Sequence, residues 1–267
     1  MTNEHPPVVM SFAGTDPSGG AGIQAAIEAI SSHGCHASTV VTCVTVQDTE
    51  NVYGFAPLDP DVVIDQARAI LEDMSVSAFH IGMIGNADTA EAINSILVDY
   101  PDIPVVLDPV LAAGGGTPLA DGELIDAILN MLLPVTTVVT PNTKEAFTLS
   151  YGADTTDACA ISLLESGCEA VLLTGTHDST DKVTNSFYQA ENPEVHRFDW
   201  DRLSHEYHGS GCTLAASIAA FMATGMEPLD AVIKAQEYTW FTLVNANRIG
   251  MGQLIPDRLF WARDFEE

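Results

Sequence analysis

The sequence predicts an α/β protein with a central, mostly parallel sheet and helices on both of its faces. Three observations predict this class. Apolar segments of strand length alternate with segments of helical spacing along nearly all of the 267 residues. Polar and glycine-rich motifs follow the strands, at the edge where open parallel sheets bind ligands. Because no linker, repeat or low-complexity segment interrupts the alternation, we expect one domain over residues 1–267.

The composition allows a large core and restricts the possible partners. Apolar residues make up 46% of the chain, and nine Lys and Arg stand against 37 Asp and Glu, a formal net charge of −28. Such a charge repels phosphate backbones, so we expect neither nucleic-acid nor anionic-membrane binding. No signal peptide precedes Val8 and no apolar run reaches membrane-spanning length, which favours a cytoplasmic protein.

The acidity has two possible sources. We hypothesise a salt-rich cytoplasm, because 37 acidic residues face only nine basic ones, and the alternative is acidic drift in a mesophile. A free energy of unfolding that is equal in dilute buffer and in molar KCl would contradict the first. The five cysteines form no zinc-binding pattern, which is typical of reduced cytosolic thiols.

The first predicted strand, 8–13, leads into a glycine-rich loop at 14–22 and a helix at 23–33. Such a loop is typical of a backbone that approaches a ligand. It is neither a Walker A loop nor a dinucleotide fingerprint, because no Gly-Lys-Ser/Thr follows it and no acidic residue closes the next strand.

A single buried strand is predicted over 38–46, followed by an edge strand or flap at 51–56. Gln47 stands at the end of the buried strand. Its amide offers a donor and an acceptor to the edge of a heterocycle, and the alternative is a surface turn residue.

The middle of the chain continues the alternation. We expect strands at 78–81, 104–107, 136–140 and 170–174, and helices at 60–74, 88–99, 121–132 and from 141 onward. Asp88 is expected to cap the second of these helices. Asp108 ends a strand, where an acidic residue is typical of a contact to Mg²⁺ or phosphate-bound water. Asn142 is expected to cap the helix after 140, with Glu145 completing a capping box or orienting metal-bound water.

Two short strands, at 185–189 and 195–198, precede the loop His208-Gly209-Ser210-Gly211-Cys212 and the last two helices, 213–224 and 228–246. Two glycines around a small hydroxyl residue let backbone N–H groups converge at a helix N-terminus, where a transferring phosphoryl group can be held. The alternative is a glycine-rich loop that merely caps the helix. Cys212 lies on the first helical turn, which should lower its thiol pKa and make it a potential base. With so few cations, backbone N–H groups and Mg²⁺ would have to supply the positive field.

Six motifs, in this order along the chain, resemble the signature of the hydroxymethylpyrimidine/phosphomethylpyrimidine kinases. They are AGTDPSGGAGIQA at 13–25, TVQDT at 45–49, IGMIG at 81–85, VLDPV at 106–110, VTPNTKEA at 139–146 and HGSGCT at 208–213. The resemblance covers about residues 8–247. It implies a ribokinase-like fold with a small β flap, and a single kinase domain.

The resemblance also implies an activity and a site. The activity is ATP- and Mg²⁺-dependent phosphorylation of 4-amino-5-hydroxymethyl-2-methylpyrimidine and then of its monophosphate, for thiamine biosynthesis. By the same resemblance, the pyrimidine would contact Gln47, Gly14, Asp16, Met83 and Val110. Mg²⁺ would contact Asp108 and Glu145, and ATP would contact Asn142, Thr174 and His177. The anion hole would consist of Gly209, Ser210, Gly211 and Cys212, with Cys212 also acting as base. A homodimer through the flap or an outer helix is expected.

Two alternatives stay open. One is a pyridoxine/pyridoxal kinase of the cysteine-bearing type, since pyridoxine also carries a hydroxymethyl group on a six-membered heteroaromatic ring. The other is a non-catalytic pyrimidine-binding protein. The chain departs from the family pattern at Ala26, usually an aspartate, and at 112–116 and 174–177, which lack the lysines often found there.

Overall fold

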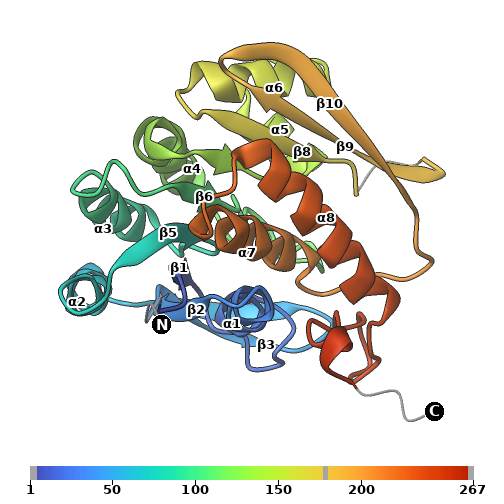
Figure 1. Cartoon of the computed structure of the whole chain (residues 1–267), viewed down its shortest axis with the longest axis horizontal. Coiled ribbons are helices and arrows are strands. Elements are labelled where there is room, and N and C mark those ends of the chain that lie inside the picture. Colours follow the sequence, from blue (N-terminus) through green and yellow to red (C-terminus); the bar gives the residue numbers. More distant parts are fainter. Residues whose placement is uncertain (1–4, 177–179, 264–267) are drawn as a thin grey trace.

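The computed structural model describes residues 5–176 and 180–263. An eight-stranded sheet crosses the molecule in the order β10-β9-β8-β7-β6-β5-β1-β2 (Figure 1). The strands from β2 to β8 are parallel, and β9 and β10 form an antiparallel hairpin at one edge. The strands are β1 Val8–Ala13, β2 His36–Val41, β5 Val76–Ile81, β6 Val105–Leu107, β7 Val138–Val139, β8 Ala170–Thr174, β9 Lys182–Gln189 and β10 Asn192–Asp201.

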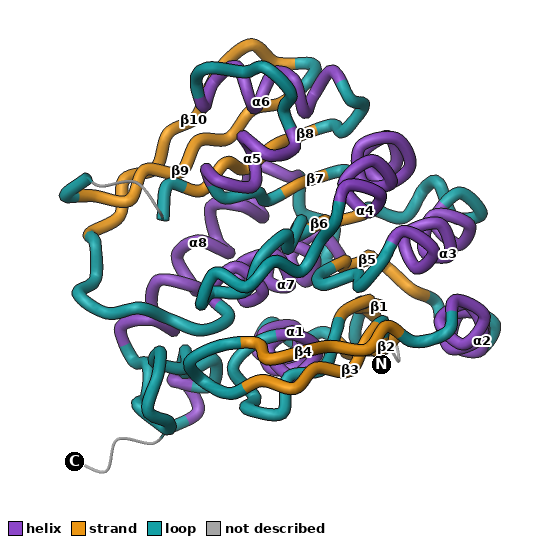
Figure 2. The backbone as a smooth tube through the Cα atoms, turned by 180° about the vertical axis from the view of Figure 1, so that it is seen from behind, coloured by secondary structure: helices purple, strands orange, loops and turns teal. Residues whose placement is uncertain are grey.

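Helices cover both faces of the sheet. Successive side chains of a strand point to opposite faces, and those of the central strands are buried on both. Met10 and Phe12 of β1 pack in one core cluster, whereas Val9, which precedes Met10, packs in the other. Five helices pack on the face with Met10 and Phe12: α2 Pro60–Leu71, α3 Ala87–Leu97, α4 Gly122–Ala127, α5 Thr143–Leu149 and α6 Thr156–Glu165 (Figure 2). Three helices pack on the opposite face, with Val9: α1 Gly22–Ser32, α7 Ser210–Ala223 and α8 Pro228–Val244. The predicted fold class is confirmed.

The buried strand predicted over 38–46 is wrong, because the chain leaves the main sheet at Thr42. The Thr42 hydroxyl donates to the Met83 carbonyl at 2.6 Å, which turns the backbone out of the sheet. Beyond it, β3 Cys43–Gln47 pairs antiparallel with β4 Val52–Pro57 as a separate flap, so the flap predicted near 51–56 is confirmed. Val44, Val46 and Tyr53 are exposed on the flap.

Several boundaries differ from the predictions for local reasons. Asn86, and not Asp88, caps α3, because its side chain accepts a hydrogen bond from the Thr89 N–H at 2.9 Å. The segment after α4 tightens into a π-helical turn, Ile128–Leu132, and a 3₁₀ turn, Leu133–Val135. Helix α6 was not predicted, and β9 and β10 are longer than expected because they pair along most of their length. The chain closes with a 3₁₀ turn, Phe260–Ala262.

Among the helices of the described residues, none is both long and apolar enough to cross a membrane.

Candidate active site

Two glycine-rich loops interlock at the carboxyl edge of the sheet. The first loop, residues 14–22, follows β1, and the second, residues 208–212, leads into α7. Gly209 has a φ of +83°, and a Cβ on it would overlap the Gly20 carbonyl. A Cβ on Gly20 would in turn overlap the His208 ring. Only glycine allows the two backbones to approach this closely.

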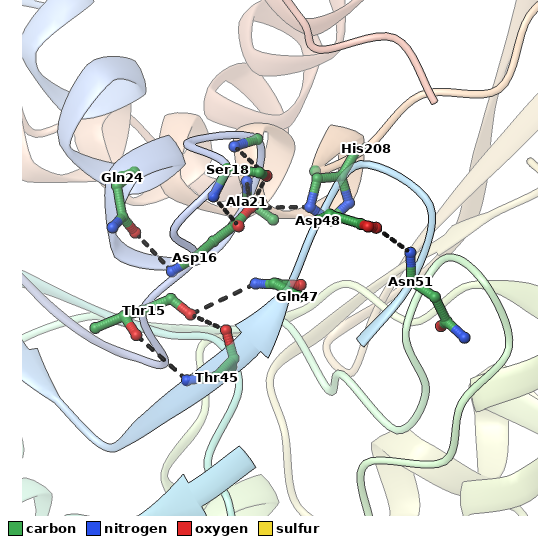
Figure 3. Close-up of polar contacts among 12 residues, drawn as sticks. Thr15, Asp16, Ser18, Ala21, Gln24, Thr45, Gln47, Asp48, Asn51 and His208 are labelled. Atoms are coloured by element: carbon green, nitrogen blue, oxygen red, sulfur yellow. Dashed lines mark hydrogen bonds and ion pairs between the residues drawn. The ribbon is translucent and has the colours of Figure 1, made fainter. Parts of the chain in front are cut away.

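Asp16 ties the two loops together through its buried carboxylate (Figure 3). It accepts hydrogen bonds from the N–H groups of Ser18 at 2.8 Å and Ala21 at 2.7 Å, and it lies 2.8 Å from His208 Nε2. Burial alone would raise its pKa, but the hydrogen bonds from His208 and Ser18 outweigh burial, and the pKa is lowered. The carboxylate is thus engaged by protein groups, so Asp16 shapes the pocket through the loop.

The second loop presents unpaired backbone donors at the start of α7. Helix α7 begins at Ser210, with Gly209 as its N-cap. In the part of the chain that the structure describes, no acceptor is found for the N–H groups of Ser210, Gly211 and Cys212. These N–H groups lie at the positive end of a 14-residue helix, which is the arrangement that an anion-binding loop requires.

Asp108 and Glu145 form a buried carboxylate pair beside this loop. They are 5% and 8% exposed, and a Cβ on Gly211 would lie 3.6 Å from Asp108 Oδ2. Burial raises the pKa of both, and the charge of Asp108 raises that of Glu145 further. Glu145 also accepts from the Asn142 N–H at 2.9 Å, which confirms the capping box.

The carboxylate pair suits Mg²⁺, which takes some of its ligands from water and substrate, better than a metal ion whose ligands all come from protein side chains. Within residues 5–176 and 180–263, no group of three or more His, Cys, Asp or Glu side chains could hold a metal ion. Mg²⁺ is usually bound by one or two carboxylates together with water and substrate phosphates. Two buried carboxylates that repel each other next to an anion loop fit that pattern.

The expected lowering of the Cys212 pKa is wrong for the free protein. Burial, followed by the negative charge of Asp108, raises the pKa of this thiol to about 12. The positive charge of Arg258 and a backbone hydrogen bond from Gly22 act in the opposite direction but do not prevail. The sequence indicated only the helix field, whereas burial and the Asp108 carboxylate, which also accepts a hydrogen bond from the thiol, determine the direction of the pKa shift.

The residues expected to contact the pyrimidine gather under the flap. A Cβ on Gly14 would lie 2.6 Å from Cys43 Sγ and 3.3 Å from Met83 Sδ, so the loop backbone lies directly on these sulfur atoms. Val110 packs on the same small apolar cluster. Gln47 is half-buried at the end of β3, and its Nε2 donates to the Thr15 carbonyl over a long 3.5 Å (Figure 3).

The residues expected to contact the nucleotide are only partly described. Asn142 and Thr174 are adjacent, joined by a parallel bridge and by the hydrogen bond from the Thr174 N–H to the Pro141 carbonyl at 2.9 Å. His177 lies outside the described residues.

Sequence reasoning missed Arg258, the largest fully buried side chain of the described residues. Its guanidinium donates to the Gly20 carbonyl, to Thr213 Oγ1 at 2.8 Å and to Glu28 Oε2 at 3.1 Å. No motif surrounds Arg258 in the sequence. The one sequence feature that could have drawn attention to Arg258 is the small number of basic residues, nine in all, because each of them is then a candidate for a specific role.

Arg258 follows a segment, residues 247–257, that also holds the flap turn. The Gly252 N–H donates to Thr49 Oγ1 at 3.0 Å, and the Gln253 N–H to the Thr49 carbonyl at 2.8 Å. The His208 N–H donates to the Leu254 carbonyl at 2.9 Å. An open cavity of about 410 Å³ lies between this segment, Glu50 of the flap turn and Gly115.

A parallel α/β sheet with an antiparallel flap, an anion loop at a helix N-terminus and a carboxylate pair beside it define a small-molecule phosphotransferase of the ribokinase-like class. The model of the phosphomethylpyrimidine kinase family matches residues 16–257. A hydroxymethylpyrimidine/phosphomethylpyrimidine kinase of Rhizobium meliloti (strain 1021) is 33% identical over 252 residues, which are 92% of this chain and 94% of the relative.

Solved structures agree with this match. Phosphomethylpyrimidine kinase from Clostridium difficile 630 superposes with a TM-score of 0.76 at 27% identity, covering 88% of this chain and 98% of its own. The pyridoxal kinase from Staphylococcus aureus in complex with AMP-PCP and pyridoxal superposes with a TM-score of 0.86 at 25% identity, covering 97% and 96%. The chain belongs to the phosphomethylpyrimidine kinase family and is a phosphotransferase.

Proposed function

We propose that this kinase transfers the γ-phosphoryl group of ATP to the hydroxyl of 4-amino-5-hydroxymethyl-2-methylpyrimidine, and then a second one to the resulting monophosphate. One observation carries the proposal: the N–H groups of Ser210, Gly211 and Cys212, for which the described residues offer no acceptor, lie beside Asp108. The first glycine loop adjoins them, and its Gly14 packs against Cys43 of the flap. The family match over residues 16–257 supports the pyrimidine as substrate.

In the reaction, the substrate oxygen attacks the γ-phosphorus, the bond to the β–γ bridging oxygen breaks, and ADP leaves. The transition state spreads negative charge over the transferred oxygens, so positioned donors contribute most of the rate. The N–H groups of Ser210, Gly211 and Cys212 would hold those oxygens. A preformed donor of this kind typically contributes about 3–4 kcal/mol.

Cys212 would accept the proton of the attacking hydroxyl. With a thiol pKa of about 12, it is protonated in the free protein, chiefly through burial and the nearby Asp108 charge. Mg²⁺ held by Asp108, Glu145 and the nucleotide phosphates would supply positive charge that neutralises the carboxylates. Compensation of the Asp108 charge would remove the second-largest of the causes that raise the Cys212 pKa and so favour proton transfer to the sulfur.

Asn142 and Thr174 would contact the nucleotide, together with His177. Asn142 lies three residues after the end of β7 and Thr174 ends β8, so both belong to the carboxyl edge of the sheet. The nucleotide analogue bound in the Staphylococcus aureus neighbour supports a nucleotide site on this fold.

Gln47 would recognise the aminopyrimidine edge with its amide, above Gly14, Met83 and Val110. Its weak contact to Thr15 leaves the amide available to a ligand. The same contact supports the second candidate, pyridoxal or pyridoxine phosphorylation, since an amide held this loosely can serve either heterocycle, and a neighbour of TM-score 0.86 binds pyridoxal.

An ADP-release assay with ATP and Mg²⁺ tests the function. We expect turnover with hydroxymethylpyrimidine and with its monophosphate, and at least about tenfold lower kcat/KM with pyridoxine. Turnover of pyridoxine alone would establish the second candidate. No turnover of any of the three by folded protein, also at high KCl, would reject both and favour a pyrimidine-binding protein.

We also propose that two copies associate through the flap. Val44 is 48% exposed, Val46 65% and Tyr53 63%, and they project from one small two-stranded sheet. A pair of strands with an apolar outer face is marginal alone and is stabilised by a partner. Light scattering should give the mass of a dimer, and the variant Val46→Lys should lower it to that of one chain; a monomeric parent protein would contradict the proposal.

A further inference from the structure

Arg258 lies where the two glycine loops meet. It is 1% exposed, although a guanidinium is rarely buried unless it is fully paired. Its fork spans three elements: the first loop through the Gly20 carbonyl, α7 through Thr213 Oγ1, and α1 through Glu28 Oε2. The planar fork offers several donors in fixed directions, which a lysine cannot reproduce.

The contact with Thr213 continues to the anion loop. Thr213 Oγ1 accepts from Arg258 Nε and donates to the Gly209 carbonyl at 2.8 Å. In a trans peptide the carbonyl and the next N–H point in opposite directions. Holding the Gly209 carbonyl toward Thr213 and Arg258 therefore directs the Ser210 N–H away from them, to the side where the phosphoryl group would be held.

The first loop is fixed in the same way. The Gly20 carbonyl accepts from Arg258 Nη2, while the N–H of the same peptide, on Ala21, donates to Asp16. Both ends of this peptide are thus held by charged side chains. Because Gly20 and Gly209 touch, fixing one loop fixes the other.

Arg258 also places a positive charge beside the anion loop, in a chain that has few basic residues. Nine Lys and Arg serve 267 residues with a net charge of −28, yet one of them is buried against the loop that would hold phosphate. Its partner Glu28 is 43% exposed and so screened by water, which leaves part of the guanidinium charge uncompensated toward the loop.

We propose that Arg258 is a positioning residue for phosphoryl transfer: by holding the Gly20 carbonyl and, through Thr213, the Gly209 carbonyl, it sets the direction of the anion-hole N–H groups. The proposal rests on the proposed kinase function. Arg258 itself touches neither the pyrimidine nor the reacting atoms.

The test compares Arg258→Gln and Arg258→Lys with the control Glu28→Gln, which removes the partly exposed ion-pair partner and leaves the loop contacts in place. We expect Arg258→Gln to lower kcat about 100-fold, the loss typical of a displaced oxyanion donor, with the KM for the pyrimidine unchanged within about threefold. Arg258→Lys keeps the charge without the fork and should lose about tenfold. Glu28→Gln should stay within about threefold of the parent. Millimolar methylguanidine should restore part of the kcat of Arg258→Gln and should not raise the kcat of the other two variants.

A folded Arg258→Gln or Arg258→Lys protein with the parent kcat would overturn the proposal, as would a loss that appears only in KM. Hydrogen exchange of the unliganded proteins gives a readout that is independent of turnover. The Ala21 and Thr213 amides, both bonded within the loops, should exchange at least about tenfold faster in Arg258→Gln and Arg258→Lys than in Glu28→Gln. Unchanged exchange would reject the role of Arg258. A parent protein that phosphorylates none of the substrates would instead reject the kinase function, and the exchange rates would still decide on Arg258.

Discussion

The two glycine loops, which would hold the phosphoryl group in the proposed reaction, and the flap, which would cover the heterocycle, are held in opposite ways. The loops are fixed by glycine contacts, by the buried Asp16–His208 pair and by the guanidinium of Arg258. The flap is a two-stranded sheet, and Gln47, which is proposed to recognise the heterocycle, makes one long contact to the loop backbone.

The difference suggests which part of a kinase of this fold must stay rigid, the loops, and which part can vary, the flap. Charge stabilisation requires donors that do not reorganise during the reaction. Recognition of a flat ring tolerates adjustment, and structural neighbours named for phosphomethylpyrimidine and for pyridoxal share this fold. We therefore expect changes in the loops to affect turnover, and changes in the flap to affect substrate preference.

The largest expected effect follows Asp108→Asn. Activity should fall by about 1,000-fold or more, since the change removes a carboxylate from the site of phosphate charge. The free protein should nevertheless become more stable. The pKa of Asp108 is raised in the folded state, so its contribution favours folding at low pH and is lost as the pH rises through the folded pKa.

In metal-free buffer, Asp108→Asn should therefore unfold at a higher temperature than the parent at pH 8 and show little difference at pH 4. Thermal melts at both pH values measure this, with the exposed Asp102→Asn as control. A variant that is less stable at pH 8 would mean that Asp108 is compensated in the free protein.

The next largest effect is expected for Gly209→Ala. The new methyl group would overlap the Gly20 carbonyl, and a φ of +83° is itself unfavourable for alanine. Turnover should fall about 100-fold, as expected when catalytic groups shift by about 1 Å. Gly225→Ala is the matched control: its φ is +87°, but no atom lies within 4 Å of the added carbon. Equal kcat values for the two variants would show that contact between the loops does not matter.

Asp16→Asn should have a smaller effect, on stability more than on chemistry. The variant weakens the bonds to Ala21 and His208, which should cost about 1–3 kcal/mol at neutral pH. Because the pKa of Asp16 is lowered by folding, its contribution is present above the unfolded pKa near 3.8 and is lost as the pH falls through the folded pKa. Urea unfolding should show the difference from the parent shrinking between pH 6 and pH 3, whereas the exposed Asp65→Asn should show none at either pH.

Gln47→Ala should have the smallest effect. Its single 3.5 Å contact contributes little to folding, so the melting temperature should stay within about 1 °C of the parent. The preference for the pyrimidine over pyridoxine should drop about tenfold, through KM. Val46→Ala, on the exposed side of the same strand, should leave the preference intact. A kcat loss for Gln47→Ala with preserved preference would place Gln47 with the transfer machinery.

Local chemistry decided which features the sequence could predict. The glycine loop after β1, the Asn142–Glu145 capping box and the flap depend on neighbouring residues, and all three are present as predicted. Thr42 was taken for strand interior, because β-branched residues suit β2 and β3 equally and only its contact with Met83 ends the strand. The Cys212 pKa depends on burial and on the charge of Asp108, which follows β6, about 100 positions earlier in the chain. Arg258 meets Gly20 across 238 positions, a distance at which no sequence pattern acts.

That last distance has a consequence for how the protein is made. The strands near the N-terminus emerge from the ribosome first and can begin to fold while the rest is being synthesised. Arg258 is synthesised 238 positions after Gly20, so the guanidinium is absent while the N-terminal half of the sheet forms. The two loops can therefore be joined only after residue 258 has been synthesised, however early β1 and the first loop fold. Nascent chains stalled before Arg258 should show no turnover, and turnover in such chains would contradict this order of events.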